Sequence, residues 1–204
     1  MKNQTTEIVF ILDRSGSMQG LEADTIGGFN STIKAQRNEE GAAFVTTVLF
    51  DNEVEILHDR IPLDQIEPMT EKQYFVRGCT ALLDAIGQTI SHIKSIHRYA
   101  REEDVPGKTL FIITTDGMEN ASREFTLSTV KKMIKQETKN GWEFIFLGAN
   151  IDVVSTAEDL GIERKMAARF DASSEGVDKS FQMMEKAICC ARKRKSIDLD
   201  SFKK

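Results

Sequence analysis

The sequence predicts an α/β fold in which helices cover both faces of a mostly parallel sheet. Short continuous apolar runs, such as residues 8–12 and 110–113, are typical of strands that are buried on both faces. Between these runs lie segments whose apolar residues recur at helical spacing, as across residues 82–93. Strands that alternate with helices in this way indicate parallel pairing through crossover helices.

Local sequence patterns, and the residues that interrupt them, predict where the strands and helices begin and end. Asp51-Asn52 predicts a turn, after which residues 54–57 return as an antiparallel edge strand. Gly27 and Gly28 are poor helix formers, so their place in the first helix indicates close packing against the sheet. Ser155 with Glu158 fits a capping box that opens a short helix. In chain order we expect strands at 8–12, 43–50, 54–57, 110–113, 142–147 and 166–170, and helices at 21–37, from 82 to the Pro106-Gly107 break, from 127 to the Asn140-Gly141 stop, from 155, and across 177–191.

The length of the chain favours one domain, and its charge argues against one class of function. The chain has 204 residues and a formal net charge of −5, which argues against a protein that coats nucleic acid. We assign residues 1–195 to this domain and residues 196–204 to a polar C-terminal tail. The segment from Arg192 onward is expected to fray, with the basic run 192–195 complementing the helix dipole.

The cysteines and the apolar runs indicate the cellular compartment of the protein. Cys79, Cys189 and Cys190 fit neither a disulfide framework nor a C-x-x-C motif, which favours a reducing compartment. No apolar run is long enough to span a membrane or to form the core of a signal peptide. We therefore expect a cytoplasmic protein.

Short polar side chains mark the sheet edge where open parallel sheets bind their ligands. Asp13, Ser15 and Ser17 follow the first strand, Thr80 precedes the helix at 82, and Asp116 follows the strand at 110–113. Each loop alone is an ordinary strand-end turn, because Asp, Ser and Gly are common there. Together the three loops supply only oxygen donors, and such sets suit hard cations such as Mg²⁺ or Mn²⁺. The sequence therefore predicts a divalent-metal site.

The order Asp13-x-Ser15-x-Ser17, then Thr80, then Asp116-Gly117 resembles the metal-ion-dependent adhesion site (MIDAS) of von Willebrand factor A (vWA) domains. The similarity extends from about Glu7 to the last helix, and it looks like the small stand-alone bacterial branch of the family. It implies a Rossmann-like, doubly wound fold with a mostly parallel six-strand sheet, one antiparallel edge strand and helices on both faces.

The resemblance also implies roles. Ser15 and Ser17 would ligate the metal through their hydroxyls, and Asp13, Thr80 and Asp116 directly or through water. In that family an acidic side chain of a partner protein fills the remaining position. The implied function is a divalent-metal-dependent protein–protein interaction module rather than an enzyme, with no nucleic-acid or membrane partner. Small cytoplasmic members often work beside ring ATPases or in stress and metal-resistance systems, so a ring ATPase is one candidate partner.

A metal-dependent phosphate-ester hydrolase is the alternative function. An apolar strand that ends in an aspartate also begins haloacid-dehalogenase-type phosphatases, whose nucleophilic Asp is followed two residues later by an acid–base Asp. Here that second position is Ser15, so the proton-transfer group is missing. No P-loop, G-x-G-x-x-G or nucleophile-elbow motif occurs either.

Other residues near these loops have two interpretations. Arg14 and Arg77 either pair with a second acidic group of the partner or point away from the site. Cys79 is either an accessible thiol or a small filler, and Asp152 either lines the rim or caps the helix. Asp84 is explained by the dipole of its helix. The three histidines are assigned to surface or packing roles.

Overall fold

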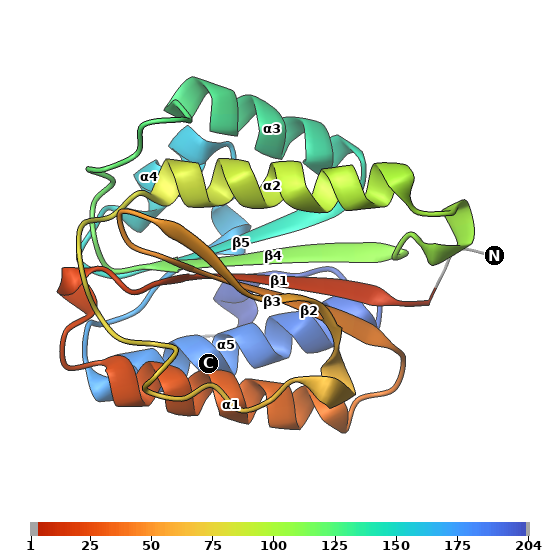
Figure 1. Cartoon of the computed structure of the whole chain (residues 1–204), viewed down its shortest axis with the longest axis horizontal. Helices are drawn as coiled ribbons and strands as arrows, with labels where there is room; N and C mark the ends of the chain where they lie inside the picture. The colour runs from red at the N-terminus through yellow and green to blue at the C-terminus, as the bar shows by residue number, and fades with distance from the viewer. Residues whose placement is uncertain (1–3, 203–204) are drawn as a thin grey trace.

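A six-stranded sheet forms the centre of the computed structural model, which describes residues 4–202 (Figure 1). Its strand order is β3-β2-β1-β4-β5-β6, with β3 antiparallel to β2 and the other pairs parallel. The strands are β1 (Thr6–Asp13), β2 (Ala43–Phe50), β3 (Val54–Pro62), β4 (Lys108–Thr115), β5 (Trp142–Gly148) and β6 (Ala167–Arg169). The predicted sheet, with its antiparallel edge strand, is confirmed.

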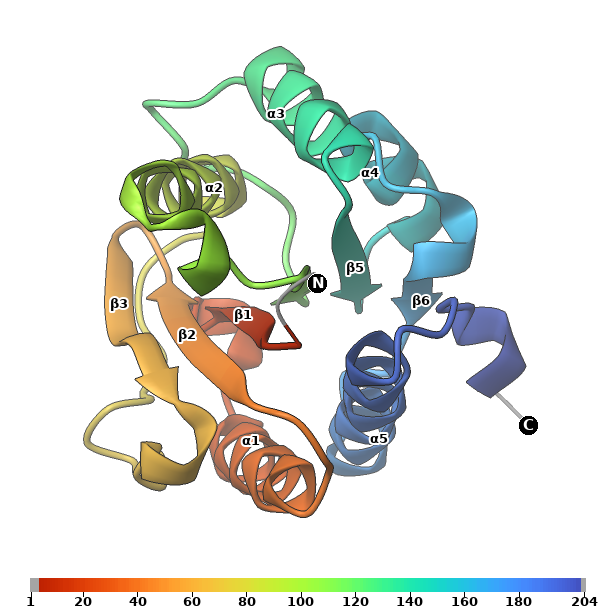
Figure 2. The same ribbon diagram turned by 90° about the vertical axis from the view of Figure 1, so that its right-hand side faces the viewer.

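Helices cover both faces of this sheet, as expected for a doubly wound fold (Figure 2). One face carries α1 (Glu22–Arg37) and α5 (Ser174–Arg192), and the other carries α2 (Leu82–Tyr99), α3 (Leu127–Lys139) and α4 (Val153–Leu160). The two helices of the first face approach closely at Gly28, where a Cβ would lie 2.2 Å from the ring of Phe181. The close packing expected at Gly28 is therefore against α5 and not against the sheet, and a Cβ at Gly27 would meet nothing within 4 Å.

The central strand β1 is longer than its apolar run. Residues 8–12 are almost completely buried, which explains their unbroken apolar character. Glu7 extends the strand although its side chain is also buried. Arg60 donates to its carboxylate at 2.9 Å, and His97 Nε2 lies 3.2 Å from it. A buried charge is tolerated when it is paired in this way, so apolar patterning alone places the start of β1 too late.

Other element boundaries also differ from the sequence expectations. The helix α4 begins at Val153 and not at Ser155, because the Asp152 side chain caps it by accepting the Ser155 N–H at 3.2 Å. The capping interpretation of Asp152 is therefore confirmed and the Ser155 capping box is wrong. Strand β3 continues to Pro62, and β6 is limited to three residues.

The C-terminal segment packs against the domain. Arg192 donates to the backbone carbonyls of Gln36 and Glu39 at 2.5 and 2.9 Å, and Ile197 and Leu199 are buried. The expectation that this segment frays is wrong as far as residue 202, because two isolated apolar side chains anchor it without any periodic signal. The last two residues of the expected tail lie outside the described part of the chain. Within residues 4–202, no helix is long and apolar enough to cross a membrane.

Candidate metal centre

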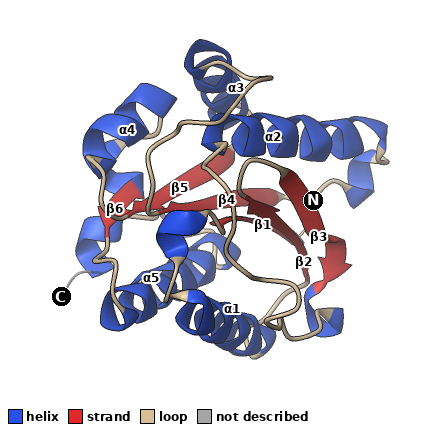
Figure 3. Cartoon of the chain, turned by 60° about the vertical axis from the view of Figure 1, so that its left-hand side comes forward, coloured by secondary structure: helices blue, strands red, loops and turns tan. Residues whose placement is uncertain are grey.

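The loops that carry the five predicted ligands lie at the carboxyl ends of the central strands (Figure 3). Asp13 is the last residue of β1, and Asp116 follows the last residue of β4. Because β1 and β4 are neighbouring parallel strands, both carboxylates reach the same edge of the sheet. Ser15 and Ser17 lie in the loop after β1, and Thr80 lies in the loop that leads into α2.

Hydrogen bonds join these side chains into one group. Ser15 Oγ lies 3.1 Å from both Ser17 Oγ and Thr80 Oγ1. Ser17 Oγ donates to Asp116 Oδ1. Asp13 Oδ1 accepts the backbone N–H of Ser15 at 2.7 Å. Three loops that are separated in the sequence by up to 99 residues therefore present their oxygen atoms to one another.

Burial makes this site unfavourable for negative charge in the absence of a cation. Burial raises the pKa of Asp13 to about 6, although hydrogen bonds from Ser15 and Thr115 lower it. Burial also raises the pKa of Asp116, against the hydrogen bond from Ser17. A cation bound between the two carboxylates would offset this cost, since an opposite charge favours their ionised forms.

Two further observations test whether the site fits a metal ion. Asp116 Oδ2 is buried and has no hydrogen-bond partner, which leaves an anionic oxygen available as a ligand. A Cβ at Gly117 would lie 2.9 Å from Thr80 Oγ1 and 3.0 Å from Ser17 Oγ. The absent side chain thus leaves space beside the hydroxyl groups. Both observations fit a hard divalent cation with oxygen ligands.

The site differs from metal centres built from histidine, cysteine and several carboxylates. No group of three or more His, Cys, Asp or Glu side chains suited to a metal ion occurs in the part of the chain that the structure describes. Two carboxylates and three hydroxyls form the candidate site instead, so its affinity would depend on the arrangement of neutral oxygen atoms.

Side chains outside the group of five hold the ligand loops in place through hydrogen bonds to backbone atoms. The buried Tyr74 hydroxyl donates to the Asp13 carbonyl at 2.5 Å, and Asn120 Oδ1 accepts the N–H of Thr80 at 2.9 Å. Asp84 accepts three backbone N–H groups, from residues 123–125, at 2.7 to 3.0 Å. It therefore anchors the loop after Asp116, and the helix dipole is not its main role. Sequence patterning gives no signal for Tyr74, because its partner is a backbone atom 61 residues away.

Both arginines pair with Asp51 of this chain. Arg14 is fully buried, with Nε 2.8 Å from Asp51 Oδ2, so its guanidinium group lies inside the protein. Arg77 is half-exposed and pairs with Asp51 and Glu53. Cys79 is exposed, so its interpretation as a filler is wrong.

The histidines do have packing and surface roles. His58 is buried and stacked on Phe29, His97 packs edge-on against Trp142, and His92 pairs with Asp59 near the surface. None of the three is among the residues that form the candidate site.

Comparisons with known proteins bear on the fold. No protein-family model and no curated protein matches the sequence. Proximal thread matrix protein 1 from the mussel byssus, solved with a zinc-occupied MIDAS motif, has a TM-score of 0.61 at 15% identity, over 93% of this chain and 47% of that chain. The manganese-loaded TRAP protein of Plasmodium vivax has a TM-score of 0.58 at 18% identity, over 89% and 74%. A von Willebrand factor type A structure from Catenulispora acidiphila has a TM-score of 0.57 at 13% identity, over 90% and 42%.

This chain has the vWA fold. The resemblance inferred from the five-residue pattern is thereby confirmed at the level of the fold. Two of the vWA structures hold a divalent metal, zinc in one and manganese in the other. The chain spans about half the length of the byssus protein and less than half of the Catenulispora protein.

Proposed function

We propose that the protein is a divalent-metal-dependent protein–protein interaction module that binds a partner carboxylate through Mg²⁺ or Mn²⁺. The observation that carries this proposal is the hydrogen-bonded group of Ser15, Ser17, Thr80 and Asp116 beside the unpartnered Oδ2 of Asp116. With Asp13, these residues would hold the metal. When bound, the metal would supply an exchangeable coordination position for an external oxygen ligand.

Charge and coordination number favour a carboxylate as that ligand. Two aspartates neutralise a divalent cation, but five oxygen ligands leave an octahedral ion one position short. A carboxylate in that position adds charge to coordination, so it displaces water more effectively than a neutral group. An Asp or Glu of a partner protein is therefore the expected ligand.

The side chains around the site indicate which other groups a partner should present. Arg14 and Arg77 are engaged by Asp51, so they are not offered to a second acidic group. Met118, next to Gly117, is 74% exposed, and Phe75, beside both arginines, is 43% exposed. We therefore expect apolar side chains, and not a second acid, beside the partner carboxylate.

The hydrolase alternative is disfavoured by the surroundings of Asp13. Its Oδ1 accepts the Ser15 N–H at 2.7 Å, and its Oδ2 accepts the Thr115 hydroxyl at 2.6 Å. A nucleophilic carboxylate needs an accessible oxygen, whereas Asp13 is buried and engaged at both. Turnover of a generic phosphate ester that needs Mg²⁺ and disappears in Asp13→Asn would reverse this preference.

Affinity capture from a cytoplasmic extract tests the proposal. We place the protein in the cytoplasm because its three cysteines are free, and a ring ATPase is one candidate partner. A partner should be retained by the native protein in Mg²⁺ and lost both in EDTA and with Asp13→Ala. Alanine scanning of the captured partner should then reveal one indispensable Asp or Glu. A partner that stays bound in EDTA, or that tolerates loss of every acidic residue, would contradict the proposal.

A further inference from the structure

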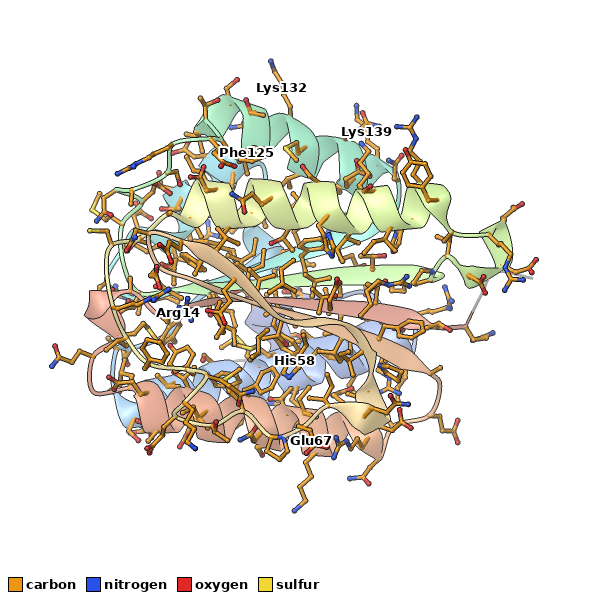
Figure 4. The ribbon with its side chains drawn as sticks, in the orientation of Figure 1. Arg14, His58, Glu67, Phe125, Lys132 and Lys139 are labelled. Carbon is orange, nitrogen blue, oxygen red and sulfur yellow. The ribbon has the colours of Figure 1, made fainter. Side chains whose placement is uncertain are left out.

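Arg14 lies within the ligand loop, but its guanidinium group points to Asp51 and Glu55 at the β2–β3 turn. Figure 4 shows it at the end of the sheet where the loops gather. Its Nε donates to Asp51 Oδ2 at 2.8 Å, and its Nη1 lies 2.7 Å from Glu55 Oε2. Both Arg14 and Asp51 are buried. A buried guanidinium group requires an anionic partner, and Asp51 is the buried one of the two carboxylates that Arg14 contacts, so we expect the conformation of the ligand loop to depend on Asp51.

Asp51 also holds the loop that carries Thr80. Its Oδ2 accepts Arg77 Nε at 2.7 Å, and its backbone carbonyl accepts the N–H of Ala81 at 2.8 Å. Its Oδ1 accepts the N–H of Glu53 at 2.8 Å, which closes the turn between β2 and β3. Despite burial, hydrogen bonds from Arg77, Glu53 and Arg14 keep the pKa of Asp51 below its ordinary value, so it is an anion at neutral pH.

Backbone contacts complete the link between the two ligand loops. The N–H of Arg77 donates to the Arg14 carbonyl at 2.9 Å, and the N–H of Gly16 donates to the Gly78 carbonyl at 3.2 Å. Gly78 has a φ of +67°, and a Cβ there would lie 2.0 Å from Asn52 Oδ1. The loop before Thr80 is thus pressed against both the β2–β3 turn and the Ser15–Ser17 loop.

We propose that Asp51 is a positioning residue of the metal site: its pairs with Arg14 and Arg77 hold the Asp13–Ser17 loop against the Thr80 loop. This inference rests on the proposed function, because it assumes that the five oxygen ligands bind a metal ion. Within residues 4–202, no hydrogen bond or ion pair joins the Asp51 side chain to the side-chain oxygens of those ligands, so it acts through the two arginines. Groups that orient metal ligands are commonly worth about 10–100-fold in metal affinity.

The chain offers a matched control at the other end of the sheet. Glu7 is a second buried carboxylate with a charge partner, since Arg60 donates to its two oxygens at 3.1 and 2.9 Å. It lies at the amino-terminal end of β1, whereas the site lies after the carboxyl end. Glu7→Gln therefore disturbs a similar ion pair without touching the ligand loops.

The experiment measures Mn²⁺ binding by the loss of the free-ion electron paramagnetic resonance signal, with native protein, Asp51→Asn, Arg77→Met and Glu7→Gln. We expect Asp51→Asn to weaken Mn²⁺ binding by about 10-fold or more, and Glu7→Gln to leave it unchanged, although both lower the melting temperature of the metal-free protein. Arg77 is half-exposed, so Arg77→Met is expected to fold even if Asp51→Asn does not, and it should weaken binding several-fold.

Two results would overturn the inference while the proposed function stands. One is native-like Mn²⁺ affinity in both Asp51→Asn and Arg77→Met, or in Arg77→Met alone if the other variant does not fold. The other is an equal loss in Glu7→Gln, which would show that general destabilisation is the cause. Failure of the native protein itself to bind Mn²⁺ would instead remove the proposed function, and this inference with it.

Discussion

Replacing Asp13 with asparagine should stabilise the metal-free protein and remove its stabilisation by metal. Burial raises the pKa of Asp13 from 3.8 to about 6. Because the folded-state pKa lies above the unfolded value, the folded state binds the proton more tightly. The ionised carboxylate therefore destabilises the fold at neutral pH, and stability is regained as the pH falls from about 6 towards 3.8.

The expected change in unfolding free energy follows from the size of this pKa shift. About two pKa units correspond to about 3 kcal/mol of unfolding free energy. Asparagine removes the charge but cannot accept hydrogen bonds from both Ser15 and Thr115, which offsets about 1 kcal/mol or more of the gain. We expect Asp13→Asn to be about 1–2 kcal/mol more stable than the native protein in EDTA at pH 7.5.

Mg²⁺ should reverse this order. At a concentration one hundred times its dissociation constant, a ligand of the folded state stabilises it by about 2.7 kcal/mol. For a chain of this length that raises the melting temperature by roughly 5–10 °C, and the gain should be absent in Asp13→Asn.

Thermal melts followed by circular dichroism give the melting temperature of each protein with and without metal. Both proteins are measured in EDTA and in saturating Mg²⁺ or Mn²⁺. An Asp13→Asn protein that melts well below the native protein in EDTA would show that Asp13 is a structural cap. A native melting temperature that no divalent ion changes would refute the metal site.

Three further predictions follow from the same geometry. The apparent Mn²⁺ affinity should fall as the pH drops below about 6, because the ion must then displace the proton of Asp13; a titration at pH 5 to 8 that shows constant affinity would contradict this. Gly117→Ala should weaken Mn²⁺ binding with little loss of secondary structure, since its methyl group would lie about 3 Å from the Thr80 and Ser17 hydroxyls, and calorimetric titration checks it. Ile112→Ala, at a fully buried position of β4, should cost about 2–5 kcal/mol in urea unfolding equally with and without metal, so a cost that depends on Mg²⁺ would be unexpected.

Much of the fold is readable from the sequence because both faces of the sheet are covered. Strands such as β4 then appear as unbroken apolar runs, and the polar residues that follow them mark one edge of the sheet. The five candidate ligands are also readable, because short oxygen-bearing side chains in strand-end loops form a local pattern. Their contacts, such as Ser15 with Thr80, agree with that pattern.

The supporting residues could not be predicted, because their roles depend on distant partners. Arg14 carries the same charge whether it is exposed or buried, and its anionic partners Asp51 and Glu55 lie about 40 residues further along the chain. Asp84 shows the first-turn preference of any helix, and its three N–H donors lie about 40 residues further on. Leu199 has no periodic neighbours, yet it is completely buried.

The close contact of α5 with α1 has a consequence for biosynthesis. All five candidate ligands have been translated by residue 116, but one face of the sheet is covered by α1 together with α5, which begins only at Ser174 (Figure 2). The close contact between Gly28 and Phe181 cannot form until residue 181 has been synthesised. A chain that stops soon after residue 174 would therefore possess every ligand and still expose its core, which makes it a target for chaperones and proteases.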